Sequence, residues 1–415
     1  RIIYKNVSKH RRDVMNYDIN QLKALADAVY GDAVLFRRKL HMNPELSEQE
    51  EQTAAAICEK LDALGIEYQS GIAGHGISAV IYGNNRDHGV GIRADMDALP
   101  LTERAEIPFK SQNPGVMHAC GHDIHTAVLL GTAEVLCQMK DKLPGSVRLF
   151  FQPSEETIGG AKQMIDAGCL SNPKIHSVIG LHVDTGTDAG SIECIPGPMN
   201  AASTEFYVTV TGRSCHGAHP TDGIDALLPA CAMVTGLQSV ITRRTDPAEA
   251  VLITVGTFES GTKENIISGE ARFSGIIRSL QMHNMASVKE HIEALCTATA
   301  QAYGASCKVE FTDSYPTLEN DDTLLAWVME AGRLVLGEDH VKINKKPSLG
   351  SDDFAFFCHS GRGIYYNIGA RHPGEEHPYA IHSDRFNPDE ECIRTGILTE
   401  VAAVLKILEE ESKQW

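Results

Sequence analysis

The feature that most constrains this chain is a change in the rhythm of its apolar residues, at about residue 198 and again at about residue 312. Outside that stretch, short β-branched runs alternate with segments whose apolar residues recur every three or four positions. The first pattern is typical of buried strands and the second of helices that bury one face. The alternation predicts an α/β fold with a mixed sheet, formed jointly by residues 15–197 and 313–415.

Helices are expected at about 20–40, 48–64, 122–139, 223–242, 281–303, 321–336 and 389–411. Buried strands are expected at Ile77–Tyr82, Val90–Ala94, Val147–Phe151, Ser177–Val183 and Ile364–Ile368. Within residues 198–312 the order is strand–helix–strand–strand–helix–strand, beginning with the period-two run EFYVTVTG. That order predicts an inserted α+β domain, a one-sided βαββαβ sheet backed by two helices.

Charge and hydropathy exclude several classes of protein. The 37 Lys and Arg residues against 55 Asp and Glu give a net charge of −18, which argues against nucleic acid or an anionic membrane as the main partner. No uncharged apolar run reaches the roughly 18–20 residues of a spanning helix. The eleven cysteines are scattered and odd in number, so we expect mostly reduced thiols and a cytoplasmic protein. Residues 1–14 are basic and lack a signal-like apolar stretch, and we expect a non-native or disordered extension before Met15.

Four short segments carry candidate metal ligands. Cys120 and His122 stand two apart in MHACGHDIH, just before a predicted helix, and Glu155 and Glu156 follow a predicted strand in FQPSEE. His182 lies at the expected end of another strand, and His382 follows a loop rich in histidine and proline. Taken singly, each has a structural alternative: a buried cysteine beside a capping pair, a solvated helix start, or a hydrogen-bonded core histidine.

Taken together, the candidates favour a metal site. Five ligands are too many for one tetrahedral zinc that keeps a position open for water. They suit two ions about 3.5–4 Å apart that share a bridging ligand, and a thiolate has the lone pairs to bridge. Glu155 is then left beside Glu156 as a carboxylate that is not needed as a metal ligand, and hydrolysis requires such a carboxylate as a general base.

At this point the motifs match a known family. GIRADMDALPL, HACGHDIHTA, FQPSEE, GLHV, HGAHPTDGIDA, NIIS, GSDDFAFF and a late IHS occur in this order. The chain resembles the aminoacylase/carboxypeptidase superfamily of co-catalytic metallopeptidases. It is most similar to the amidohydrolase branch, which includes hippurate hydrolase, N-acetyldiaminopimelate deacetylase and the plant hydrolases of auxin–amino acid conjugates.

The resemblance implies a catalytic domain with two divalent ions, zinc or manganese, and a lid domain over 198–312 that also forms a homodimer or a higher oligomer. By position it makes Glu155 the general base and His216 a catalytic lid residue, acting in many members on the neighbouring subunit's site. It assigns Asn265, Arg278 and Gly350 to substrate binding. The metal ligands that it implies are Cys120, His122, Glu156, His182 and His382.

The chain departs from the family pattern in two places. Other branches place a metal-binding His-x-Asp after the strand that corresponds to VGIRADM, whereas this chain has Asp95-Met96-Asp97. We expect Asp95 and Asp97 to support the metal ligands by hydrogen bonds. The lid motif of many relatives has a second histidine where this chain has Thr221, and His219 occupies a usually variable place, so His219 is a second candidate beside His216.

These observations predict an enzyme that hydrolyses the amide bond of an N-acyl (acetyl, benzoyl or similar) amino acid or a related small conjugate. Two alternatives stay open. The first is a di-metal hydrolase of another small ester or phosphoester. The second is a non-catalytic protein that binds amino-acid conjugates, although the presence of Glu155 counts against it.

Overall fold

The computed structural model describes residues 17–415, so the expectation for residues 1–14 lies outside the described part of the chain. The described chain divides into two compact units. The first contains the described residues up to Gly197, together with Asn320–Lys345 and Phe357–Trp415; the second contains Pro198–Glu319 and Lys346–Phe356.

The boundary of the second unit differs from the expected residues 198–312. It extends to Glu319 and includes the separate segment Lys346–Phe356, which contains Gly350. Backbone hydrogen bonds explain this. Ala201 donates to the Gly350 carbonyl at 2.8 Å, and Ser348 donates to the Met199 carbonyl at 2.8 Å. Such pairing between distant segments carries no local sequence pattern.

An eight-stranded sheet forms the centre of the first unit, in the order β1-β2-β4-β3-β5-β16-β6-β15. Its strands are β1 (Glu67–Ile72), β2 (Gly76–Ile81), β3 (His88–Asp95), β4 (Ser146–Gln152), β5 (Lys174–Asp188), β6 (Ile192–Cys194), β15 (Val341–Ile343) and β16 (Arg362–Arg371). Neighbours β4, β3, β5 and β16 run parallel, whereas β1, β2 and β6 pair antiparallel with their neighbours β2, β4 and β16. The predicted mixed α/β sheet is thereby confirmed. Because the central strands are parallel, their carboxyl ends meet at one edge.

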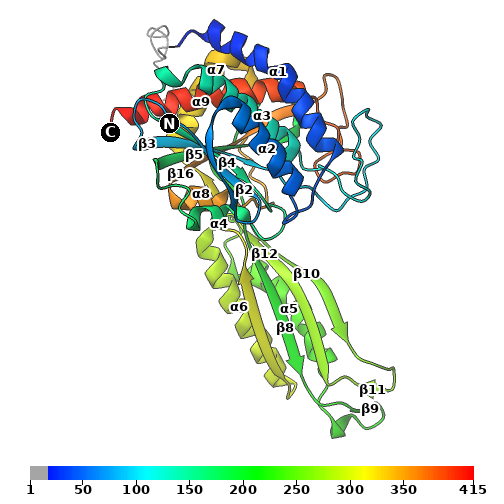
Figure 1. The fold of residues 1–415 in the computed structure, drawn as a ribbon. Helices are drawn as coiled ribbons and strands as arrows, with labels where there is room; N and C mark the ends of the chain where they lie inside the picture. Colours follow the sequence, from blue (N-terminus) through cyan, green and yellow to red (C-terminus); the bar gives the residue numbers. More distant parts are fainter. Residues whose placement is uncertain (1–16) are drawn as a thin grey trace. The chain divides into compact units, whose positions relative to one another are not determined.

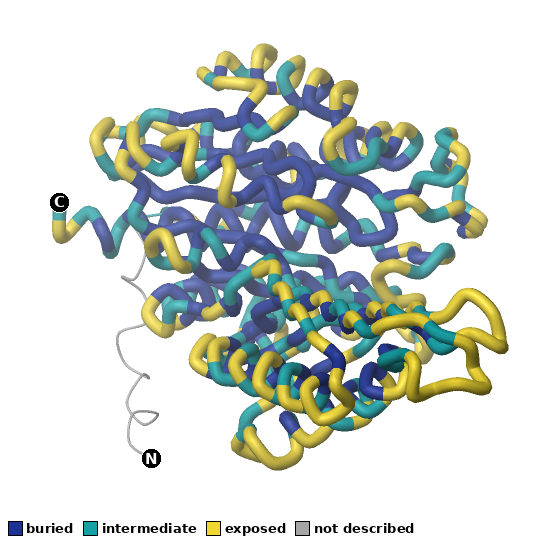
Figure 2. The backbone as a smooth tube through the Cα atoms, turned by 90° about the horizontal axis from the view of Figure 1, so that it is seen from below, coloured by how far each residue is buried: buried dark blue, intermediate teal, exposed yellow. Residues whose placement is uncertain are grey.

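The helices of the first unit follow the expected apolar spacing. They are α1 (Ile19–Met42), α2 (Glu51–Leu64), α3 (His122–Gln138), α4 (Gly160–Asp166), α7 (Asp322–Leu336) and α9 (Glu391–Ser412), with α8 (Ala355–Ser360) at the unit boundary. Helices α1, α3, α7 and α9 pack against one another over one face of the sheet (Figure 1). Helix α9 is buried along most of its length, and the strands beneath are buried as well (Figure 2).

The second unit has the order strand–helix–strand–strand–helix–strand. Its main elements are β8 (Ala202–Thr211), α5 (Leu227–Arg244), β10 (Val251–Ser260), β12 (Glu270–Ser279), α6 (Met282–Ala302) and β13 (Ser306–Asp313). The strands form an antiparallel sheet in the order β10-β12-β8-β13, and α5 and α6 pack on it. Phe206, Phe273 and Ile292 belong to its separate apolar core.

Short elements complete the second unit. A two-stranded ribbon of β9 (Cys215–His216) and β11 (Ile266–Ile267) lies beyond the end of the sheet where Thr211 pairs with Glu270 (Figure 1). Strands β7 (Gly197–Asn200) and β14 (Leu318–Asn320) pair with each other. Over residues 17–415, none of the helices combines the length and the apolar character that a membrane crossing requires.

Candidate metal centre

The candidate ligands gather where the parallel strands of the large sheet end. Asp95 ends β3, Glu155 and Glu156 follow β4, and the His382 loop follows β16. Cys120 and His122 stand at the start of α3, which follows the loop after β3. This is the edge at which open α/β sheets hold ligands, since successive loops leave the strands there in close proximity.

His182 does not lie at the end of its strand as the sequence predicted. Strand β5 continues to Asp188, because its parallel pairing with β16 extends six residues beyond His182. His182 nevertheless lies level with the end of β3, since Arg93 pairs with Gly180 two residues earlier. The ligand edge is therefore set by the end of β3, and β5 extends past it.

Five of the predicted residues form two overlapping groups of three. Cys120, His122 and His182 make one group, and Cys120, Glu156 and His382 make the other; within each group the potential ligand atoms lie within 4.8 Å of one another. The Cys120 Sγ atom is 3.3 Å from His182 Nε2, and Glu156 Oε1 is 3.2 Å from His382 Nε2. Cys120 is thus the residue that the two groups share.

Glu155 lies in the same cluster. Its carboxylate forms a third group of potential ligand atoms with His122 and Glu156, again within 4.8 Å. The predicted base therefore stands directly beside the predicted ligands.

Two buried polar atoms of this cluster lack a hydrogen-bond partner among the described residues. They are His122 Nε2 and Glu156 Oε1, which lie 3.9 Å apart. Buried polar atoms are nearly always satisfied, so an unsatisfied pair implies a missing partner. A nitrogen and a carboxylate oxygen beside a thiol suit a borderline divalent cation. The residues present therefore fit a metal ion.

Hydrogen bonds on the opposite ring nitrogen direct buried His122 and half-buried His182 into the cluster. His122 Nδ1 donates to the Asp97 carbonyl oxygen at 2.9 Å, and His182 Nδ1 donates to the Val183 carbonyl oxygen at 2.8 Å. A bond of this kind fixes the tautomer and leaves the Nε2 lone pair for a metal. Both rings are thus prepared for ligation through Nε2.

The two aspartates support this arrangement from buried positions. Asp97 Oδ2 accepts hydrogen bonds from Ser47 Oγ at 2.7 Å and from the Glu156 backbone N–H at 3.0 Å. Asp95 Oδ2 accepts from Arg93 at 2.6 Å. Burial alone would raise the pKa of Asp95, but the charges of Arg93 and nearby histidines hold that pKa well below its usual range. Asp95 is therefore a buried carboxylate, whose negative charge favours a cation nearby.

Burial and the neighbouring charged groups also shift the pKa values of two candidate ligands, Cys120 and His122. Burial raises the pKa of the Cys120 thiol well above its usual range. Burial would lower the pKa of His122, but Asp95, Cys120 and Asp97 together raise it well above its usual value. Without a cation, therefore, the cluster draws a proton to His122 and keeps one on the thiol. A bound metal ion would displace both protons.

Unusual backbone conformations occur at the same place. Gly121, between Cys120 and His122, has a φ of 91°, and a Cβ atom there would lie 2.4 Å from Val183 Cγ2. Only glycine fits that position. Ser154 and His382 have φ values of 58° and 63°. Non-glycine residues rarely adopt this conformation, and its concentration around a site is typical of functional backbone.

Sequence reasoning missed several residues that hold the cluster. His125, one turn after His122 on α3, hydrogen-bonds to Asp95; its signal was the HDIH spacing, which places both histidines on one helix face. Buried Glu50 accepts the backbone N–H of Ser154 at 2.8 Å, next to Glu155. No local signal points to Glu50, since its partner is 104 residues away.

The predicted residues of the second unit do not form one cluster. His216 is exposed on β9 and its ring centroid lies 5.4 Å from that of His219; Gly217 donates to the Asn265 carbonyl oxygen at 2.8 Å. Arg278 is at the other end of β12 from this ribbon and hydrogen-bonds to Ser351, next to Gly350. Eight residues of strand separate Glu270 from Arg278, a length on the order of 25 Å.

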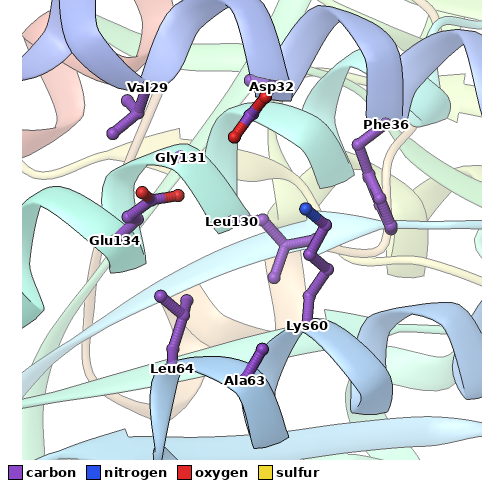
Figure 3. Close-up of a pocket in the computed structure, with 10 residues that line it drawn as sticks. Val29, Asp32, Phe36, Lys60, Ala63, Leu64, Leu130, Gly131 and Glu134 are labelled. Atoms are coloured by element: carbon purple, nitrogen blue, oxygen red, sulfur yellow. The ribbon is translucent and has the colours of Figure 1, made fainter.

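A separate pocket of about 200 Å³ lies between α1, α2 and α3 (Figure 3). Its walls carry Asp32, Lys60 and Glu134 above an apolar floor. The α3 residues that line it are two to three helical turns beyond His122. The pocket therefore has no part in the cluster.

Comparison with known proteins agrees with the geometry. The sequence profile of Peptidase family M20/M25/M40 matches residues 91–406. The chain is 39% identical over 303 residues to an N-acyl-L-amino acid amidohydrolase of Geobacillus stearothermophilus, covering 73% of this chain and 81% of that one. It is 35% identical to thermostable carboxypeptidase 2 of Saccharolobus solfataricus, covering 93% of this chain and 97% of that one. A crystal structure of a dinuclear metal-binding M20 peptidase from Bacillus subtilis aligns with a TM-score of 0.80 at 30% identity, covering 92% of this chain and 99% of that one.

Proposed function

Because the chain belongs to the peptidase family M20/M25/M40, we propose that it is a metal-dependent hydrolase that cleaves the amide bond of N-acyl amino acids or related small conjugates. The observation that carries the proposal is the pair of ligand groups sharing Cys120, with His122 Nε2 and Glu156 Oε1 buried and without a hydrogen bond among the described residues. Two groups of three with one shared residue suit a pair of ions.

The ligands in this proposal are Cys120, His122, Glu156, His182 and His382, with Asp95 and Asp97 behind them. A mixed sulfur, nitrogen and oxygen set suits zinc and also accommodates manganese. Two such ions, when bound, supply Lewis-acid polarisation of a carbonyl and make water a stronger nucleophile. The chain's own residues then position the substrate and move the protons.

Glu155 acts as the general base in this scheme. It takes a proton from the attacking water and later delivers it to the leaving amine, so the same carboxylate serves as base and then as acid. Its place beside His122 and Glu156 supports this role.

His216 stabilises the negative charge that develops on the amide oxygen. Its Nδ1 accepts the Ala218 backbone N–H at 3.1 Å, so the neutral ring carries its proton on Nε2 and can donate there. A donor aimed at a developing oxyanion lowers the barrier to attack. His219 stands beside it as a second donor.

Arg278 and Asn265 bind the substrate's carboxylate in this proposal, with the Gly350 backbone at the pocket wall. These two side chains lie at opposite ends of one sheet, so one small substrate cannot touch both within a single copy. We therefore propose a homodimer, or a higher oligomer built from such dimers, in which the ribbon carrying His216 and the adjacent Asn265 complete the partner's site. The exchange would be reciprocal in a two-fold dimer.

The partners proposed are small molecules, and the location proposed is the cytoplasm. All eleven cysteines are free thiols, as reducing conditions would keep them. The net charge of −18 disfavours nucleic acid and anionic membranes as partners.

A second candidate activity is removal of a carboxy-terminal amino acid from a peptide. It is favoured by the relative named a carboxypeptidase, which matches nearly the full length of this chain. The chemistry at the metal centre would be the same, and only the acyl side of the substrate would differ.

A substrate panel tests both activities. Metal-free protein is reloaded with zinc or with manganese. Amine release is measured from N-acetyl, N-benzoyl and longer N-acyl amino acids and from dipeptides, and phosphate release is measured from phosphate esters. We expect turnover of N-acyl amino acids that depends on added metal. Turnover of dipeptides alone would select the second candidate, and turnover of phosphate esters alone would overturn both.

A further inference from the structure

His125 is a buried histidine of α3 that the proposed chemistry does not use. Its side chain is 1% exposed, and both ring nitrogens are engaged. Nδ1 lies 2.6 Å from Asp95 Oδ1, and Nε2 lies 3.0 Å from the backbone nitrogen of Val183. His125 therefore connects the end of β3 to the residue that follows His182 on β5.

The second contact fixes the tautomer of the ring. A backbone N–H can only donate, so His125 Nε2 must accept with its lone pair. The ring proton is then on Nδ1, which donates it to Asp95. Since neither nitrogen has a lone pair left, His125 cannot itself be a metal ligand, although its ring nitrogen lies within 4.8 Å of potential ligand atoms of Asp95 and His122.

The contact to Val183 bears directly on the direction of His182. Val183 donates its N–H to His125 and accepts the Nδ1–H of His182 on its carbonyl oxygen at 2.8 Å. The Val183 backbone is thus held on one side and holds the His182 ring on the other. A shift of this backbone would turn His182 Nε2 away from Cys120 Sγ, now 3.3 Å distant.

The other end of the connection is anchored in the core of the sheet. Asp95 accepts Arg93 Nη1 at 2.6 Å, and Arg93 Nε donates to Gln152 Oε1 at 2.8 Å. Arg93, Asp95 and Gln152 are all buried, and they lie at the ends of the adjacent strands β3 and β4. His125 is therefore tied to a rigid part of the sheet, which is what a positioning group requires.

We propose that His125 is a positioning residue that sets the orientation of the ligand His182 through the Val183 backbone. The inference rests on the proposed function, because it takes His182 to be a metal ligand. In this proposal, the orientation of His182 requires the hydrogen-bond acceptor on His125 Nε2. The donor on Nδ1 and the volume of the ring do not suffice.

Three variants separate these contributions. His125→Gln is long enough to place an amide oxygen near the position of Nε2 while its amide N–H₂ faces Asp95. His125→Asn reaches only to the position of Nδ1, so it can donate to Asp95 but cannot reach Val183. His125→Leu retains volume and removes both hydrogen bonds.

The readouts are zinc affinity, from competition with a chelating indicator, and the separate values of kcat and KM for an N-acyl amino acid. Loss of an outer hydrogen bond to a metal ligand typically lowers affinity by about 10–100-fold. We expect this loss in the Asn and Leu variants, with kcat falling more than KM rises. The Gln variant should recover most of the affinity.

Thr132→Val is the matched control, since it removes a buried hydrogen bond of the same helix, to Glu400, without touching the cluster. It should lower thermal stability and leave zinc affinity unchanged. Equal zinc affinities of the Asn and Gln variants, or wild-type affinity in folded His125→Leu, would overturn the inference. Wild-type protein that binds neither zinc nor manganese would instead overturn the proposed function.

Discussion

The metal cluster of the first unit and the ribbon of the second differ in how far the single chain completes them. In the cluster, His122 is buried, His182 is half-buried, and each is fixed by a hydrogen bond on its rear nitrogen. On the ribbon, His216 and Asn265 are exposed, and Arg278 lies at the far end of the sheet. The chain thus organises one part of the site by itself and leaves the other part dispersed.

This difference separates two requirements of the proposed reaction. Metal ligands must converge within a few ångströms, and a rigid parallel sheet with its supporting hydrogen bonds provides that convergence. Groups that contact the substrate must let it enter and leave, so they belong on exposed elements. Four changes test whether the division holds.

The largest effect should follow Glu155→Gln. The amide keeps the shape of the carboxylate but cannot take the proton, so kcat should fall by about 10²–10⁴-fold. Metal content, measured by elemental analysis after gel filtration, should stay at the wild-type value. Unchanged turnover would remove Glu155 from the mechanism, and loss of metal would make it a ligand.

Mixing two inactive variants would sharpen the contrast between the regions. His216→Ala should lose about 10²–10³-fold in kcat, because an oxyanion donor is removed. When it is unfolded and refolded together with an equal amount of Glu155→Gln, the mixture should regain about a quarter of wild-type activity, since about half of the dimers are heterodimers and one of their two sites is intact. No recovery would place His216 in its own chain's site. His283→Ala, exposed on α6, should have no effect on turnover.

A smaller loss is expected from Gly121→Ala, which disturbs the cluster from the backbone. The added Cβ would lie 2.4 Å from Val183 Cγ2, at a φ of 91°. We expect zinc affinity to fall by about 10–100-fold, as when support of a ligand is lost. Gly190→Ala is the matched control: its φ is 85°, but nothing lies within 4 Å of the added atom. It should cost stability alone. Equal zinc affinities in both variants would contradict the role of Gly121.

The smallest effect concerns the helix layer behind the cluster. Glu400 of α9 is buried and accepts a hydrogen bond from Thr132 of α3 at 2.9 Å. Burial raises the pKa of Glu400 from its ordinary 4.5 to about 8. The folded protein keeps a proton that the unfolded chain releases, so stability falls as the pH rises through that window.

Glu400→Gln should therefore raise Tm by a few degrees at pH 8.5 and by much less at pH 5, measured by calorimetry. Exposed Glu59→Gln is the control and should show no such trend. Zinc affinity should not change in either variant. A Tm gain at pH 5 equal to that at pH 8.5 would contradict the raised pKa.

The sequence predicted the strand–helix alternation and a set of five candidate ligands because each leaves a local pattern. The sequence alone shows Cys, His or Glu residues after predicted strands, and the parallel sheet brings these residues together. The support of the cluster was less visible. Glu50 and Ser154 form their bond across 104 residues, and neither stands in a distinctive pattern. The separation of Arg278 from Asn265 likewise depends on strand register, which the motifs do not contain.

The sharing of Cys120 by both ligand groups carries a consequence for durability. Addition of a single oxygen to that sulfur would remove a donor from both groups in one event, whereas damage to any other ligand would affect one group. If Cys120 binds metal as proposed, the coordinated thiolate would be shielded from peroxide, so metal occupancy would protect the enzyme, and metal starvation and oxidative stress would act together on its lifetime.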